Sequence, residues 1–178
     1  MESEVRELLI EQLKDAYSAE KQALRCMQKT VRKATSPALK EGIQLHIEQT
    51  QTQIERVEQA LEALDSRPGR KVCEAMRGLV EEATHEIEEY EKGPILDLVI
   101  VAGMQRIEHY EIAAYGTDVA LAQALSEGTV IALLEETLRE EKQTDVKLTQ
   151  VTQESLMAAA MAGESGSDDK AQPKRRAR

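Results

Sequence analysis

The chain has 178 residues, a formal charge of −10 at pH 7, four Tyr and no Phe or Trp. This length suits one domain, the aromatic-poor composition argues against a β fold, and the negative charge argues against nucleic acid as a partner. We also expect no membrane association, because no apolar run approaches the roughly 20 residues that cross a bilayer. The acidic N-terminus lacks a signal-peptide pattern and the two cysteines show neither metal-site spacing nor a disulfide framework, which favours a cytoplasmic protein.

Apolar residues recur every three or four positions from Val5 to Val31, which predicts a first helix of roughly thirty residues. Ser36 and Pro37 are typical of an N-cap and a first helical position, so a second helix is expected to start there. Its apolar stripe comprises Leu39, Ile43, Ile47, Thr50, Ile54, Val57, Leu61 and Leu64. Because the connection is short, the two helices should be antiparallel neighbours.

The second half of the chain repeats this pattern after a break at 65–69. A short amphipathic helix is expected over about 72–91, a long one over about 95–125, and a last one from about 129 to beyond Val151. Two tight helix pairs joined by one long connection are typical of a ferritin-like antiparallel four-helix bundle, here with an extra short helix in the crossover. We therefore predict an all-α domain over residues 1–162.

Residues 163–178 form a different kind of segment, rich first in Gly, Ser and Asp and then in Lys and Arg. Such a composition predicts a disordered basic tail. The tail is either a solvated end without a specific role or a contact for an acidic partner or a membrane surface.

Acidic residues lie on otherwise apolar helix faces. Glu108 and Glu111 are one turn apart beside Ile107 and Met104, and Glu141 with Asp145 forms a second pair on the last helix. Counting 1.5 Å per residue from the turns brings both pairs to one level, together with Glu20 on the first helix. Buried carboxylates cost several kcal/mol each unless positive charge joins them. A metal site is the simplest explanation, and solvated helix faces are the alternative.

The second helix offers weaker ligands at this level. Where a carboxylate would be expected it carries Gln53, which is either a weak oxygen ligand or a hydrogen-bond partner of one. His46, one turn before Thr50, is either a ligand or a histidine at the core boundary. Tyr115, one turn after Glu111, either donates a hydrogen bond to a carboxylate or simply packs. His109 and His85 are expected to lie outside the site.

Carboxylates with few nitrogen ligands suit iron, with manganese or zinc as alternatives, and they can bridge two ions. The residues expected to bind the metal directly are thus Glu20, Glu108, Glu111, Glu141 and Asp145, with Asp145 at the position where a dimetal bundle has His. His46 and Gln53 are the further candidates. An open coordination position would allow reaction with O2 or peroxide.

Several segments resemble the YciF/YciE-type ferritin-like family, which is related to rubrerythrins. They are Tyr17–Gln22, Lys71–Met76, Gln105–Gly116 and Glu135–Asp145. The resemblance covers about residues 5–155. It implies a dimeric helical bundle of the kind found in bacterial, stress-associated proteins, with Glu20, Glu108, Glu111 and Glu141 as metal ligands. It does not imply a settled reaction. Where the related pattern has Glu-x-x-His on the second helix, this chain has Gln49–Gln53.

Two functions are consistent with these features. The first is a di-iron carboxylate stress-response protein that oxidises Fe(II) with peroxide or O2. The second is a non-catalytic helical homodimer, or a cargo or adaptor module, whose acidic site is structural.

Overall fold

The computed structural model of the protein describes residues 2–164, which contain helices and connecting turns but no strand. The elements are α1 (Glu2–Thr30), α2 (Pro37–Ala63), α3 (Glu74–Glu89), α4 (Pro94–Ala124), α5 (Gly128–Val151), a π-helical turn (Thr152–Leu156) and α6 (Met157–Glu164). This confirms the all-α prediction, and the helices begin and end close to the expected positions. Of the predicted basic tail, residues 165–178 lie outside the described residues.

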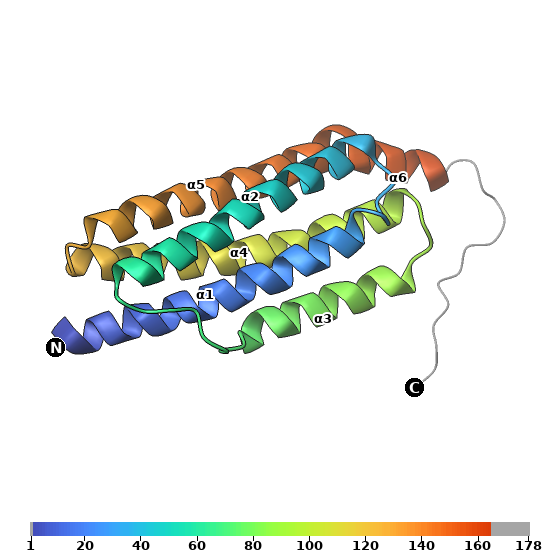
Figure 1. The fold of residues 1–178 in the computed structure, drawn as a ribbon. Coiled ribbons are helices and arrows are strands. Elements are labelled where there is room, and N and C mark those ends of the chain that lie inside the picture. Colours follow the sequence, from blue (N-terminus) through green and yellow to red (C-terminus); the bar gives the residue numbers. More distant parts are fainter. Residues whose placement is uncertain (1, 165–178) are drawn as a thin grey trace.

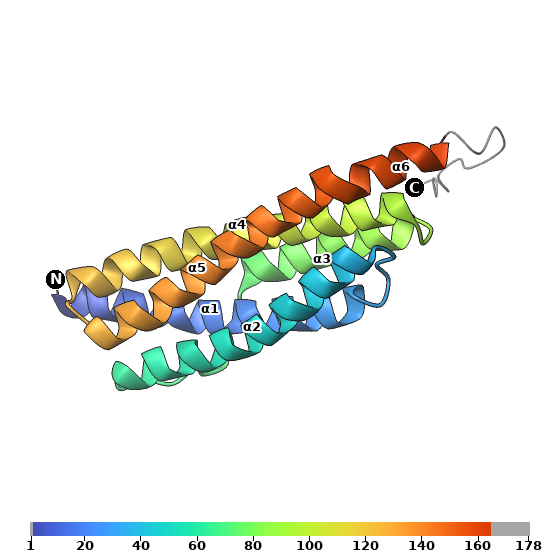
Figure 2. The same ribbon diagram turned by 90° about the horizontal axis from the view of Figure 1, so that it is seen from above.

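The four long helices form an antiparallel bundle (Figure 1). α1 packs against α2 and α4, and α5 packs against the same two helices, so α1 and α5 occupy opposite corners. The short helix α3 lies outside this square, against α1 and α4, as the second view also shows (Figure 2). The chain crosses from the α1–α2 pair to the α4–α5 pair through the segment that holds α3. No helix of the described part is both long and apolar enough to span a membrane.

The turn between α1 and α2 is fixed by side chains from two elements. The Ser36 hydroxyl accepts a hydrogen bond from the Leu39 backbone N–H, as expected for an N-cap, and Pro37 begins the helix. The buried carboxylate of Asp97, in the first turn of α4, accepts hydrogen bonds from the Thr35 hydroxyl and from the backbone N–H groups of Thr35 and Ser36. These contacts tie the start of the second helix pair to the turn of the first.

Helix α3 approaches α4 closely at one point. A Cβ added at Gly103 would lie 2.9 Å from the Cβ of Ala83, which is shorter than a normal carbon–carbon contact. Gly103 therefore lets α3 lie directly on α4. This contact covers the outer side of the helix that carries Glu108 and Glu111.

The apolar core is divided into two large clusters along the bundle. One is built around Leu9, Leu13 and Tyr115, and the other around Ile43, Ile100 and Leu148. The polar residues Glu20, Glu108, Glu111 and Glu141 are buried at the level between them. The bundle thus encloses a charged layer between two apolar layers, which is where the sequence predicted a metal site.

Candidate metal centre

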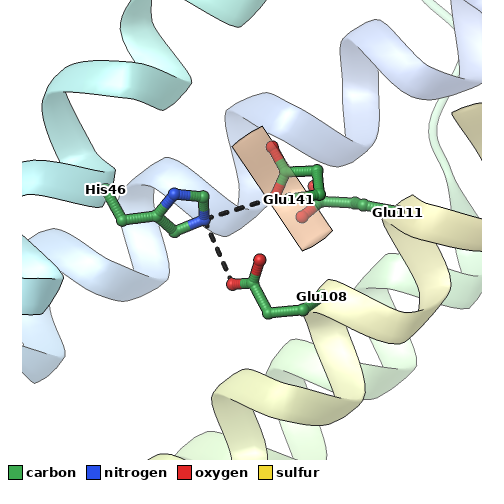
Figure 3. Close-up of side chains that lie close together, drawn as sticks. All are labelled: His46, Glu108, Glu111 and Glu141. Atoms are coloured by element: carbon green, nitrogen blue, oxygen red, sulfur yellow. Dashed lines mark ion pairs between the residues drawn. The ribbon is translucent and has the colours of Figure 1, made fainter. Parts of the chain in front are cut away.

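Four buried side chains meet in the middle of the bundle (Figure 3). His46 comes from α2, Glu108 and Glu111 from α4, and Glu141 from α5. One ligand atom from each of the four lies within 4.8 Å of the others, and none of the four side chains is more than 3% exposed. One imidazole and three carboxylates at this spacing can converge on a metal ion.

The imidazole of His46 is held on both sides. Its Nε2 lies 3.1 Å from Glu108 Oε1 and 3.5 Å from Glu141 Oε2. On the other side of the ring, Nδ1 forms a 3.3 Å hydrogen bond with the Thr144 hydroxyl. Nε2 is the nitrogen that faces the carboxylates, so it is the atom that could ligate, while Thr144 sets the ring orientation.

Several carboxylate oxygens in this group have no hydrogen-bond partner among the described residues: Glu108 Oε2, Glu111 Oε1 and Glu141 Oε2. A buried polar atom without a partner costs about 1–3 kcal/mol, and a charged one costs more. The protein therefore presents unpaired acceptor oxygens to one small volume. A cation placed there would satisfy oxygens that the protein itself leaves unpaired, so the residues present fit a metal ion.

The same crowding raises the pKa values of these carboxyl groups. Burial raises the pKa of Glu111 well above its ordinary value, and the charges of Glu20, Glu141 and Glu108 raise it further. Burial is also the main cause of the raised pKa values of Glu141 and Glu108, the latter lying near 8. Without a cation, the site consequently favours protonated carboxyl groups at neutral pH.

Glu20 lies at the edge of this group. It is buried on α1, and its Oε1 accepts a 2.5 Å hydrogen bond from the Tyr115 hydroxyl. Burial and the charge of Glu141 raise the pKa of Glu20 to about 8. Helix α1 therefore contributes a carboxylate next to the group. Of the two roles expected for Tyr115, donation of a hydrogen bond to a carboxylate is confirmed.

Gln53 contacts the group as a hydrogen-bond donor. Its amide nitrogen donates to Glu141 Oε1 and, at 3.0 Å, to Glu140 Oε2. Glu140 is buried as well and is paired with Arg56. The Gln53 amide thus positions Glu141, while its own Oε1 has no hydrogen-bond partner among residues 2–164 and remains available as an oxygen ligand.

Asp145 lies beside the group and not within it. Its side chain is 21% exposed, and Oδ1 lies 3.4 Å from His109 Nε2 and accepts a 2.9 Å hydrogen bond from Gln105. Asp145 is not among the four residues whose ligand atoms converge, and its carboxylate contacts Gln105 and His109. Its charge still raises the pKa of Glu108.

The two remaining histidines lie at the surface. His109 is 69% exposed and faces Asp145, and His85 is 77% exposed next to Glu89 on α3. Neither belongs to the buried group.

Residues 4–161 match the family described as "Domain of unknown function (DUF892)". The chain belongs to this family. Protein YciF of Escherichia coli (strain K12) is 43% identical to this DUF892 member over 146 residues, which are 82% of this chain and 88% of that protein.

Solved structures agree with this assignment. The crystal structure of the E. coli stress protein YciF has a TM-score of 0.81 and 40% identity to this DUF892 member, over 88% of this chain and 97% of that chain. YcfI, a putative structural protein from Rhodopseudomonas palustris, has a TM-score of 0.79 and 39% identity, over 82% and 92% of the two chains.

A more distant neighbour identifies the fold. A two-domain protein from Anabaena variabilis, which contains DJ-1/ThiJ/PfpI-like and ferritin-like domains, has a TM-score of 0.60 and 14% identity, over 97% of this chain and 42% of that one. At this identity the likeness concerns the fold alone. It confirms the ferritin-like bundle predicted for this DUF892 member.

Proposed function

We propose that this protein is a ferritin-like stress-response protein whose buried centre binds iron and promotes oxidation of Fe(II) by peroxide or O2. The observation that carries the proposal is the convergence of the buried side chains of His46, Glu108, Glu111 and Glu141. The stress-response role is drawn from the resemblance to the E. coli stress protein YciF.

The ligand set favours iron over harder cations. An imidazole together with carboxylates suits Fe(II), Mn(II) and Zn(II), whereas Mg(II) and Ca(II) prefer oxygen ligands alone. The four convergent residues suffice for one ion. A second ion would use Glu20, which lies next to the group and close enough to Glu141 and Glu111 for their charges to interact.

Each surrounding residue has a defined task toward a bound ion. Thr144 orients His46, Gln53 orients Glu141, and the Tyr115 hydroxyl holds one oxygen of Glu20. Three ionised carboxylates would balance the charge of an Fe(III) ion and exceed that of an Fe(II) ion by one. The apolar layers on either side keep bulk water away. Bound iron would supply the one-electron redox change that the protein side chains lack.

The alternative function is a non-catalytic helical module in which the acidic centre only stabilises the bundle. It is favoured by the hydrogen bonds that already hold His46, Gln53 and Glu20 in place. It also agrees with the description of YcfI from R. palustris as a putative structural protein.

Iron oxidation kinetics distinguish the two functions. With Fe(II) at two ions per chain and peroxide added, we expect the protein to accelerate the formation of Fe(III) by about tenfold or more over buffer, which corresponds to ~1.4 kcal/mol of barrier. The Glu141→Ala variant should fall to the rate in buffer. Glu136→Ala is the matched control, because Glu136 is on the same helix but its side chain is 44% exposed and paired with Arg139. A wild-type rate equal to that in buffer would favour the structural alternative.

A further inference from the structure

Arg56 on α2 and Glu140 on α5 form an ion pair that is largely enclosed by the bundle. The guanidinium Nη1 donates a 2.6 Å hydrogen bond to Glu140 Oε2, and Nη2 donates a 3.0 Å hydrogen bond to Oε1. Only 16% of the Arg56 side chain and 10% of the Glu140 side chain are exposed. Two parallel bonds fix both side chains, and removal of either partner leaves a charge that solvent screens poorly.

Gln53 joins this ion pair to the proposed centre. Its Nε2 donates a hydrogen bond of 3.0 Å to Glu140 Oε2 and a second one to Glu141 Oε1. Both hydrogens of one amide group are therefore used by two carboxylates that are adjacent in sequence. The contacts run without a gap from Arg56 through Glu140 and Gln53 to Glu141, one of the four residues that meet in the centre.

Arg56 supplies a positive charge that the acidic layer otherwise lacks. Among residues 2–164, no lysine or arginine forms an ion pair with the four glutamates of this layer, Glu20, Glu108, Glu111 and Glu141. The charge of Glu140 nevertheless reaches the layer. Burial and the charge of Glu141 are the main causes of the raised pKa of Glu20, and the charge of Glu140 raises it further. Without Arg56, Glu140 would add an uncompensated negative charge.

Such a charge would change the balance between the two oxidation states of bound iron. A negative charge nearby stabilises Fe(III) more than Fe(II), because the trivalent ion is attracted more strongly. Inside the bundle this attraction is screened less than at the protein surface. The pairing of Glu140 with Arg56 therefore limits how strongly the centre favours Fe(III).

We propose that Arg56 is a positioning residue of the centre, which holds Glu140 against Gln53 and cancels its charge, and thereby keeps the reduction potential of bound iron from falling. This inference rests on the proposed function, because it concerns iron bound at the centre. Its electrostatic part also applies to a divalent ion that undergoes no redox change, which allows a separate measurement.

The reduction potential of bound iron tests the proposal, measured by redox titration of the iron-loaded protein and followed through the absorbance of Fe(III). Arg56→Met should lower the potential by about 59 mV or more, which is a tenfold change in the ratio of Fe(III) to Fe(II). Glu140→Gln should raise the potential, because the guanidinium then lacks its carboxylate. The double variant should return close to the wild-type potential, because it lacks both charges.

Opposite shifts in the two single variants, cancelled in the double variant, are specific to charge, since a loss of packing would not change sign. Arg56→Lys keeps the charge without the two-bond geometry and should retain most of the potential. This variant and Glu140→Gln test the proposal even if Arg56→Met fails to fold. Arg139→Met is the matched control, because Arg139 pairs with Glu136 on the same helix as Glu140 but its side chain is 51% exposed. It should leave the potential unchanged.

The Mn²⁺ affinity of the metal-free protein, measured by equilibrium dialysis, separates this proposal from the proposed function. We expect Arg56→Met to bind Mn²⁺ more tightly than the wild type and Glu140→Gln to bind it more weakly, each by about threefold or more. Shifts of the same sign in both variants, or no shift, would overturn the role of Arg56. The expected pattern without accelerated iron oxidation would overturn the proposed function alone, and a wild type that binds no metal would overturn both.

Discussion

Between pH 5 and pH 8 the metal-free protein should lose roughly 3–6 kcal/mol of its free energy of unfolding. The main cause of this loss is burial, which raises the pKa values of Glu20 and Glu108 from 4.5 to about 8. Below pH 4.5 these groups are protonated in both states. Between pH 4.5 and 8 the unfolded chain releases the protons while the folded chain retains them, so stability falls with rising pH.

Urea unfolding at several pH values, with a chelator present, measures this effect. Glu108→Gln should flatten the dependence, because the amide does not titrate. Saturating Mn²⁺ should reverse it, because a bound cation favours the ionised carboxylates and its stabilising effect then grows with pH. A metal-free protein whose stability is constant or increases over this range would show that the carboxyl groups are not crowded as described.

His46→Ala should weaken Fe(II) binding by about 100-fold or more, which is ~2.7 kcal/mol. The variant removes the only nitrogen ligand of the four-residue group and leaves a cavity beside Glu108 and Glu141. The measurement is an anaerobic Fe(II) titration followed by equilibrium dialysis.

His109→Ala provides the comparison for this prediction. His109 directly follows Glu108 in sequence, but its side chain is 69% exposed and lies 3.4 Å from the Asp145 carboxylate outside the buried group. Its removal should change the affinity less than threefold, about 0.65 kcal/mol. Equal losses in the two variants would mean that His46 acts through general stability and not as a ligand.

The fold could be predicted from the sequence because its signals are local. Ser36 and Pro37 define the start of α2 by capping chemistry, and the apolar periodicity of α1 and α4 requires a shared core. Short and long connections then leave few possible arrangements of the helices. The level of the acidic layer followed from the constant rise of a helix.

Side-chain geometry within that layer was less predictable. His46 lies one turn from the expected level on α2, but its imidazole extends to Glu108. Sequence spacing alone does not predict this contact. Asp145 has the correct spacing from Glu141, but Gln105 and His109 from the neighbouring helix engage it. Thr144 could have indicated that His46 belongs to the site, because Thr144 lies three residues after Glu141 on the same helix face and hydrogen-bonds the His46 ring.

Glu140 and Asp118 show a second limit. Glu140 precedes Glu141 in sequence, and it is buried with Gln53 and Arg56 of α2 as its partners, which sequence spacing does not reveal. Asp118 has polar and apolar neighbours in sequence that predict nothing unusual. Only the folded bundle shows that its side chain is 1% exposed and that neither carboxylate oxygen has a hydrogen-bond partner among residues 2–164.

The most direct test of the metal centre is the iron content per chain after anaerobic Fe(II) loading and desalting, in the wild type and in Glu111→Ala. We predict one to two tightly bound ions in the wild type and none in the variant. Two ions would show that Glu20 completes a dinuclear site, and one would assign the ion to the four-residue group. Wild-type protein without bound iron, or a variant that retains the full content, would contradict the proposed centre.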